Sequence, residues 1–327
     1  MENSKRKEFW DALCSIRDNT PEHIQDLCAK IIVPDYLCRF RSVSENSLIQ
    51  LQENKLYYSS ADHYDDPFDT FIHVDIERIR ALHMFLSSVI NSENPDFVNN
   101  LKLLEPVTGI NGEQFFSILK NNPLELSRLE EGFKQIRTTI QKNLFSICFC
   151  ENVLNETLWI KYANNYKGFA LVYDMRSQDT FLCGNEEICK NCRSIIERPS
   201  VYPVYYSDRA YDATQFALAC LLWGESNAPR QIVELAFKNV MWDAERISLI
   251  KKKCHEYDEE WRMIRPTMMP DRTCIRMKPS KIVLGLRISD PDRAKVISAA
   301  NVAGISNIEE LYINENDLLD SRPVVGK

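Results

Sequence analysis

Residues 144–174 read LFSICFCENVLNETLWIKYANNYKGFALVYD and contain two apolar runs separated by a polar segment that is rich in aromatic residues. The run from Leu144 to Cys150 has the length of a buried strand, and Gly168 precedes a second such run that ends at Tyr173. Between them, residues 155–163 have the length of a short helix. We therefore expect a strand, a helix and a strand that pack as one unit.

Strand-like and helix-like segments alternate along the rest of the chain. From Tyr36, YLCRFRS has the composition of a strand, SENSLIQLQEN has a Ser44 N-cap and helical periodicity, and KLYYSS is again strand-like. Further strands are predicted at residues 201–207, 256–264, 281–289 and 309–314. Helices are predicted across residues 211–249 and 291–303. Strands separated by unequal helical segments, without an internal repeat or a Gly/Ser linker, predict a single α+β domain over residues 1–327.

Three stretches are predicted to decorate this domain. Residues 1–33 have the pattern of two short helices and are expected to form an N-terminal helical cover. Residues 72–143 are predicted to be a helical insertion. Residues 175–200 are polar and contain cysteines, and we expect them to form a loop.

The charge of the chain argues against a broad nucleic-acid-binding face. The formal net charge is −7, whereas most proteins that bind duplex nucleic acid carry an extended basic surface. Two basic runs, residues 5–7 and 251–253, are interpreted as solvated helix faces. With nine glycines, the chain contains neither G-x-G-x-x-G nor G-x-x-x-x-G-K-[ST], the two commonest nucleotide-binding loops.

The sequence predicts a cytoplasmic protein without a membrane partner. No segment reaches the roughly 18 consecutive apolar residues of a membrane span, and the first residues, MENSKRKEFW, lack the apolar core of a secretory signal. The eleven cysteines are odd in number and widely spread, which indicates reduced thiols and not a disulfide framework.

The segment from Glu256 to Arg262, EYDEEWR, is the strongest candidate for chemistry. On a strand, Asp258, Glu260 and Arg262 would project from one face. Glu260 would then be a carboxylate that stabilises a developing cation or activates a hydroxyl, with Arg262 tuning its charge. The alternative is a ladder of surface ion pairs on a half-exposed strand, and on the strand pattern alone this alternative is the commoner case.

Two arginines on the first predicted strand form a second candidate. Alternation places Arg39 and Arg41 on one face, where two guanidinium groups can hold a pyrophosphate or a carboxylate. The alternative, commoner for an isolated pair of arginines, is that they pair with strand neighbours or with three nearby carboxylates, Asp65, Asp66 and Asp69.

An aromatic pair on the predicted helix is a third candidate. Trp159 and Tyr162 lie three residues apart, so they share a helix face and can supply a stacking wall for a planar ring. The alternative, that both belong to the core, is the commoner situation for large aromatic side chains.

Four cysteines raise the question of zinc. The spacing of Cys183, Cys189 and Cys192 resembles half of a zinc site, which Cys254 or the adjacent His255 could complete. Only the Cys189/Cys192 pair has the spacing of a zinc knuckle. We therefore favour exposed thiols on a loop over a metal site.

Several of these segments, in this order, resemble one family of bacterial proteins. LCRFRS, KLYYSSADHYDDPFD, SICFCEN, LWIKYANNYKGFALVYD, YDEEWR and KPSKIVLGLRIS are similar to the bacterial domain of unknown function 2971 family. The resemblance covers residues 36–327 and carries no assigned activity.

The order of elements also resembles, more distantly, the ADP-ribosyltransferase fold. That resemblance implies a mixed, split β-sheet, an arginine or histidine on the first strand, a strand and a helix lining a nicotinamide pocket, and a catalytic glutamate on a late strand. It implies NAD as substrate. The residues that it assigns are catalytic Glu260 and Asp258, and NAD-binding Arg39, Arg41, Ser146, Cys148, Trp159 and Tyr162. On the strand that would line the nicotinamide pocket, this chain has SICFC where ADP-ribosyltransferases usually have Ser-Thr-Ser or Tyr.

The leading hypothesis is an NAD-dependent ADP-ribosyltransferase, or an NAD-cleaving relative, in bacterial antiphage defence or toxin biology. The acceptor, whether protein, nucleic acid, a small molecule or water, is left open. A second hypothesis is a non-catalytic module that binds a ligand or a partner. A third is a magnesium-dependent nucleic-acid enzyme that uses the carboxylates of Asp65, Asp66, Asp69 and Glu260.

Overall fold

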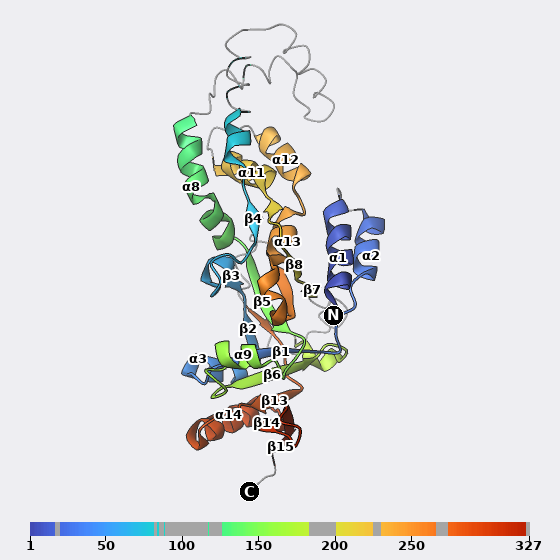
Figure 1. Ribbon diagram of the computed structural model, residues 1–327, viewed down its shortest axis with the longest axis vertical. Helices are drawn as coiled ribbons and strands as arrows, with labels where there is room; N and C mark the ends of the chain where they lie inside the picture. Colours follow the sequence, from blue (N-terminus) through green and yellow to red (C-terminus); the bar gives the residue numbers. More distant parts are fainter. Residues whose placement is uncertain are drawn as a thin grey trace.

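The computed structural model describes residues 1–16, 20–81, 84, 88, 117, 126–182, 201–224, 230–265 and 274–324. Within these ranges, the centre is a nine-stranded sheet in the order β15-β14-β13-β6-β1-β5-β11-β7, with β3 beside β5 (Figure 1). Its strands are β1 Tyr36–Arg41, β3 Ser59–Ser60, β5 Phe145–Cys150, β6 Phe169–Asp174, β7 Val201–Pro203, β11 Glu260–Arg265, β13 Lys281–Leu284, β14 Ile308–Ile313 and β15 Leu319–Pro323. Within this nine-stranded sheet only β13 and β14 run parallel to each other, so the sheet is mixed and the predicted α+β fold is confirmed.

The two halves of the sheet meet at β1. This strand pairs with β6 along its whole length, from Tyr36 to Arg41. With β5 it pairs only at Cys38, which lies opposite Cys150. Beyond that pair β1 and β5 diverge, so the sheet is open alongside Arg39 and Arg41.

Strand β5 is joined on its other side to β11 over six residue pairs. Cys150 lies opposite Glu260, and Cys148 lies opposite Arg262. Because residues directly opposite one another in a sheet project from the same face, these four side chains share one face. Ser146 follows on the same face of β5, two residues before Cys148.

The unit that contains β5 and β6 has the predicted helix, α9 Glu156–Lys161, between its strands. The Asn155 side chain accepts a hydrogen bond from the backbone N–H of Leu158 at 3.2 Å and caps the helix. Asn164, Asn165 and Tyr166 then have left-handed φ angles of 48°, 55° and 67°, which turn the chain back into β6.

Gly168 allows β6 to approach the end of β1. A Cβ atom at this position would lie 2.0 Å from the carbonyl oxygen of Arg41, so no larger residue fits without a shift of the backbone. Because this position has no side chain, the chain entering β6 can lie against the Arg41 end of β1, next to the opening of the sheet.

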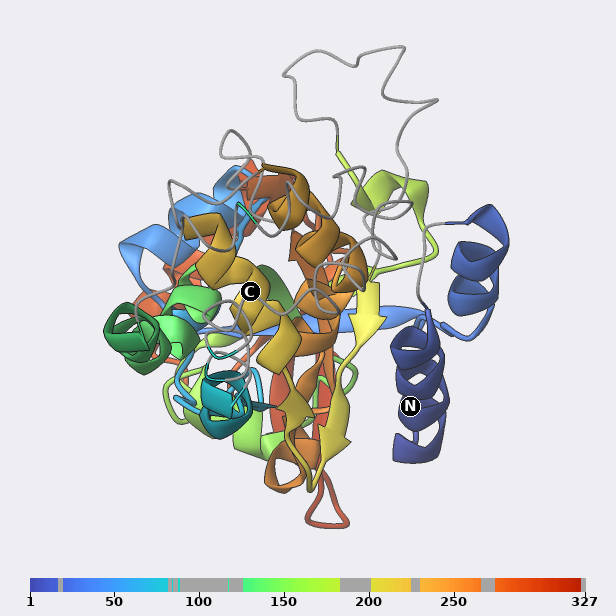
Figure 2. The same cartoon turned by 90° about the horizontal axis from the view of Figure 1, so that it is seen from above.

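Helices cover both ends of the sheet. α14 Asp290–Val302 lies beside β13–β15 and packs against α3 Glu45–Gln52, while α8 Leu126–Lys142, α11 Thr214–Gly224 and α12 Arg230–Asn239 gather at the far end (Figure 1). α3 begins with a capping box, in which the Ser44 and Ser47 side chains each accept from the other's backbone N–H. α1 Asn3–Ser15 and α2 Pro21–Ala29 stand to one side of the sheet (Figure 2).

Short strands and single helical turns complete the described structure. Three two-stranded sheets are present: β2 Lys55–Tyr57 with β12 Cys274–Arg276, β4 Ile72–His73 with β9 Tyr211–Asp212, and β8 Tyr205–Ser207 with β10 Ile250–Lys252. Further helical elements are α13 Asp243–Ser248 and the 3₁₀ helices η1 Ala61–His63, η3 Gln178–Thr180 and η4 Lys253–Asp258.

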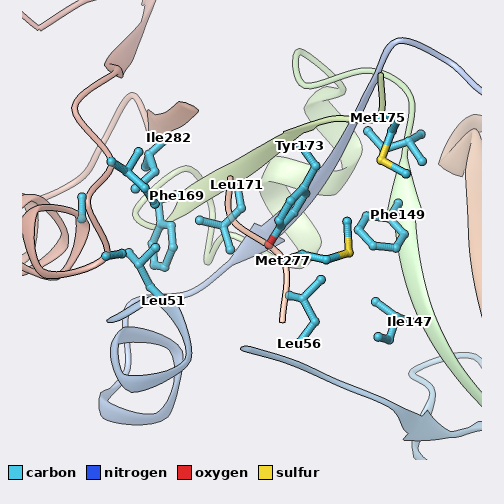
Figure 3. Close-up of a cluster of buried hydrophobic side chains, with 14 of the residues drawn as sticks. Leu51, Leu56, Ile147, Phe149, Phe169, Leu171, Tyr173, Met175, Met277 and Ile282 are labelled. Atoms are coloured by element: carbon cyan, nitrogen blue, oxygen red, sulfur yellow. The ribbon is translucent and has the colours of Figure 1, made fainter. Parts of the chain in front are cut away.

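The largest core cluster lies on one face of the sheet and joins its two halves (Figure 3). Phe149 of β5 and Tyr173 of β6 meet edge to face, with ring centroids 5.7 Å apart. Leu51 of α3 and Phe169 of β6 belong to the same cluster. Since burial of apolar side chains is the main driving force of folding, this cluster holds the halves together where the β1–β5 pairing is interrupted.

The structure corrects several predicted elements. The strand expected at residues 256–264 begins only at Glu260, because Lys253–Asp258 form a 3₁₀ helix and Glu259 has a left-handed φ of 44°. The strand at 201–207 breaks at Val204, and its two parts join different sheets. Residues 251–252 lie on a strand, β10, and not on a solvated helix face. β15 has no counterpart among the predicted strands.

Most of the predicted insertion at 72–143 and of the loop at 175–200 lies outside the described residues, and α8 is the main described part of the insertion. No helix in the described ranges is long and apolar enough to cross a bilayer.

Candidate functional site

A cavity of about 820 Å³ occupies the place where β1 and β5 diverge. Its lining brings together most of the predicted site residues: Arg39, Arg41, Ser146, Cys148, Tyr162, Asp258 and Glu260. These come from β1, β5, the end of α9, η4 and β11, which are far apart in sequence. Trp159 is absent from the lining.

One wall of the cavity is a buried network of charges. Lys251 Nζ lies 2.7 Å from Asp258 Oδ2, 3.1 Å from Glu260 Oε2 and 3.4 Å from Asp69 Oδ2. Arg262 binds both oxygens of Asp69, at 2.9 and 2.7 Å, and donates from Nε to Glu260 Oε1 at 2.7 Å. All five side chains are buried. The alternative of a half-exposed surface ladder is therefore wrong, since these ion pairs are inside the protein.

Two of the three carboxylates of this wall, Glu260 and Asp258, have pKa values shifted in opposite directions. Burial alone would raise the pKa of Glu260, but the charges of Arg262 and Lys251 outweigh it and hold this pKa well below the usual range. Burial raises the pKa of Asp258, and Lys251 only partly opposes this. Asp258 Oδ1 is buried without a hydrogen-bond partner among the described residues. Glu260 is thus a fixed negative charge, whereas Asp258 retains an unused oxygen.

The arginine pair lines the cavity from β1. Arg39 Nη1 is buried and has no hydrogen-bond partner in the described structure, and the guanidinium lies 5.8 Å from the centre of the Phe149 ring. Arg41 donates to the Phe40 carbonyl at 3.3 Å. The charge of Arg39, followed by burial, lowers the pKa of Arg41 to about 9.

No ion pair links either arginine to a carboxylate within the described ranges. The alternative in which they pair with the Asp65, Asp66 and Asp69 carboxylates is therefore not observed, since Asp69 is bound by Arg262 and Lys251. Two adjacent cations that face a cavity and have no carboxylate partner among the described residues can hold an anionic group.

A chain of polar groups crosses the floor of the cavity on β5. Tyr64 Oη is hydrogen-bonded to Ser146 Oγ, which lies 3.5 Å from Cys148 Sγ. Burial raises the pKa of the Cys148 thiol to about 12, and the negative charge of Glu260 adds to this effect. This group is therefore a neutral donor and not a thiolate nucleophile.

The two aromatic residues of the α9 segment have different environments. Trp159 is completely buried, donates to the Val153 carbonyl at 2.6 Å, and packs against Phe40 and Tyr166. The prediction that Trp159 stacks on a ligand is therefore wrong, because its ring is enclosed by the core. Tyr162, which is 40% exposed, lines the cavity.

The N-terminal helix supports the backbone of Glu260. Arg6 Nη1 donates to the carbonyls of Glu260 at 2.7 Å and Val204 at 3.0 Å, and Nη2 bonds to Glu151 at 2.6 Å. The backbone N–H of Glu260 donates to Tyr206 Oη at 2.7 Å. Both backbone polar groups of Glu260 are thus used, so its position is tied to α1 and β8 as well as to the sheet.

The four cysteines of the zinc hypothesis are divided between a segment outside the described residues and η4. Cys183, Cys189 and Cys192 lie outside the described residues, and Cys254 is exposed. Within the described ranges, no three His, Cys, Asp or Glu side chains are grouped as metal ligands.

Three residues of the site have roles that the sequence did not indicate. Lys251 belongs to a basic run, which resembles a solvated face. Tyr64 lies in a turn with several carboxylates. His255 drew attention only as a zinc ligand. For Lys251, the apolar residues Leu249 and Ile250 just before the run were the one local sign of a strand.

Comparisons of this chain with protein-family models, with curated proteins and with solved structures found no match.

Proposed function

We propose that the protein binds NAD in this cavity and cleaves the bond between nicotinamide and ribose, either transferring ADP-ribose to an acceptor or releasing it to water. One observation carries the proposal. An ionised carboxylate, Glu260, lines one cavity at the opening of the sheet together with Arg39 and Arg41, which form no ion pair with any described residue.

The carboxylate suits the chemistry of the bond that breaks. As nicotinamide leaves, positive charge develops on the ribose, in an oxocarbenium-like transition state similar to that of glycoside cleavage. A fixed negative charge stabilises this state without a cost of reorganisation. Arg262 and Lys251 keep Glu260 ionised and hold both of its oxygens in place.

The other walls suit the rest of the dinucleotide. The guanidinium groups of Arg39 and Arg41 match a pyrophosphate in charge and in donor geometry. Tyr162 lines the same cavity as Asp258 and Glu260, and burial raises the pKa of its hydroxyl. A volume of about 820 Å³ falls within the range of small-molecule sites.

A non-catalytic binding module is the second candidate. The observation that favours it is that Arg262 and Lys251 already bind both carboxylate oxygens of Glu260, so neither oxygen is without a partner. In that case the buried charges stabilise the fold, and the protein binds a ligand in the cavity without altering the ligand chemically. The magnesium-dependent nucleic-acid enzyme has less support, because Arg262 occupies both oxygens of Asp69.

Nicotinamide release tests the proposal. Purified protein is incubated with NAD, and nicotinamide is followed by chromatography for the wild type, Glu260→Gln and the control Glu259→Gln. Glu259 is the neighbouring residue and does not line the cavity. We expect Glu260→Gln to lower the rate by about 100-fold or more, while Glu259→Gln stays close to the wild type.

Titration calorimetry with NAD separates the two candidates. NAD binding that Arg39→Met weakens, without any nicotinamide release, would favour the binding module. If Glu260→Gln and the wild type release nicotinamide equally fast, Glu260 has no part in the mechanism. An absence of both binding and release would remove NAD from consideration.

A further inference from the structure

His255 lies beside the charged wall of the cavity, between two carboxylates. It belongs to η4, Lys253–Asp258, and lines the cavity together with Glu260. Its Nε2 atom is 3.0 Å from Asp66 Oδ2, and its Nδ1 atom is 3.9 Å from Asp258 Oδ2. The ring is mostly buried, with 21% of the side chain exposed. A partly accessible imidazole between two carboxylates has the surroundings of a proton acceptor.

The contacts of the ring define which nitrogen is free to act. Asp66 Oδ1 is used by the backbone N–H of Phe68 at 2.8 Å, so Oδ2 is the oxygen that faces His255. Oδ2 is buried and has no hydrogen-bond partner among the described residues, so a proton on Nε2 faces an unoccupied carboxylate oxygen and leaves Nδ1 as the basic nitrogen. Nδ1 has one further neighbour, Tyr257 Oη at 3.3 Å, a long contact that an incoming hydroxyl group can replace.

We propose that His255 is the general base that activates the acceptor, and that the acceptor is an oxygen nucleophile, either water or the hydroxyl group of a second substrate. This inference rests on the proposed cleavage of NAD. Asp66 orients the imidazole, and Asp66 and Asp258 together stabilise the imidazolium ion that forms.

The proposed step conserves atoms and charge. The C–N bond between ribose and nicotinamide breaks, and its electron pair leaves with the nicotinamide nitrogen, which becomes neutral. The acceptor oxygen forms a bond to the same ribose carbon, and the proton of that oxygen moves to His255 Nδ1. With water as acceptor, the products are nicotinamide, ADP-ribose and one proton, which His255 later releases to solvent.

The base itself restricts the class of acceptor. An imidazole can assist a hydroxyl group, whose proton becomes acidic only as the new bond forms. A guanidinium group is a cation that must lose its proton before it can attack, and with a pKa above 12 it keeps that proton in the presence of imidazole, whereas a hydroxyl group attacks while still neutral. Transfer to an arginine side chain would therefore make no use of His255, whereas transfer to a hydroxyl group or to water would.

Chemical rescue by azide tests the assignment. The variants are His255→Gln, Asp66→Asn and, as a matched control, His73→Gln, which alters an exposed histidine outside the cavity. We expect His255→Gln to lower turnover of NAD by about 100-fold, Asp66→Asn to lower it less, and His73→Gln to leave it unchanged. Azide attacks without losing a proton, so it should restore at least about a tenth of wild-type turnover to His255→Gln, with ADP-ribosyl azide as product.

The outcomes separate this inference from the proposed function. If the wild type cleaves NAD and His255→Gln does so equally fast, or is slow and not rescued by azide, His255 is not the base and only this inference fails. If the wild type does not cleave NAD at all, the proposed function fails and this inference fails with it. Thermal unfolding of each variant establishes that a loss of turnover is not a loss of folding.

Discussion

Replacing Lys251 by methionine is the sharpest test of the charged wall. The side chain is 5% exposed, and its ammonium group is within 3.4 Å of three carboxylates, those of Asp69, Asp258 and Glu260. Wild-type protein sets two cations, Lys251 and Arg262, against these three anions. Methionine has a similar shape without the charge, so the variant leaves one cation against three buried anions.

The expected cost follows from which carboxylate loses its partner. Arg262 still binds Asp69 and Glu260 in the variant, so the loss falls mainly on Asp258. Removing one partner of a buried ion pair costs about 3–5 kcal/mol, and we expect a fall of this size in the free energy of unfolding at pH 8. The Lys251 pKa is raised in the folded protein, where the attraction of Glu260, Asp69 and Asp258 outweighs burial. Its stabilising effect is therefore complete at pH 8 and is lost only as the pH rises through that raised pKa.

The cost should depend on pH. Burial already raises the pKa of Asp258, and without Lys251 this pKa rises further, so Asp258 takes up a proton as the pH falls. Protonation removes the uncompensated charge. At pH 5.5 the loss in stability should therefore be smaller than at pH 8, by about 1 kcal/mol or more.

Urea unfolding followed by tryptophan fluorescence measures both effects. The control is Lys253→Met, two residues away, where the side chain is 53% exposed and lies 3.6 Å from Asp208. Exposed pairs of this kind contribute at most about 1 kcal/mol. If Lys251→Met costs no more than Lys253→Met at pH 8, or if its cost is the same at both pH values, the account of the charged wall is refuted.

Two further substitutions test how the cavity is held. Gly168→Ala should lower the free energy of unfolding by about 3 kcal/mol, because its Cβ atom would lie 2.0 Å from the Arg41 carbonyl oxygen. The control, Gly304→Ala, should cost about 1 kcal/mol, because its φ is 70° and its Cβ atom meets only the flexible side chain of a lysine. Equal losses for the two variants in urea unfolding would contradict this. Arg246→Met should cost about 3–5 kcal/mol, because Arg246 pairs with buried Asp243 and binds two carbonyl groups of the N-terminal segment. A loss below about 1 kcal/mol would mean that the N-terminal helices are held by other contacts.

Local patterns predicted much of the fold. The apolar runs on either side of residues 155–163 became β5 and β6, and Ser44 and Asn155 cap the helices that follow them. Each of these features depends on residues that lie close together in the sequence, so it can be predicted from the sequence alone. The strand expected at 256–264 was wrong at its start, because Glu259 adopts a left-handed conformation that alternation does not reveal.

The candidate site could be predicted only in part. Arg39 and Glu260 were named from their strands, and the structure places both on one cavity. Trp159 and Tyr162 were equivalent by spacing, yet one is enclosed by the core and the other faces the cavity. Burial depends on what packs against a helix, and periodicity along the helix does not contain that information.

The sequence by itself determined the α+β class, the order of the main strands and the residue types available for chemistry, because periodicity and capping act over short distances. Only the tertiary structure decided where the sheet opens, since that depends on β1 pairing with β5 at one residue pair and diverging beyond it. It also decided that Lys251, in a run that looks solvated, is buried against three carboxylates. The energy of a charge is set by its neighbours in space, and for Lys251 one of them, Asp69, lies far away along the chain.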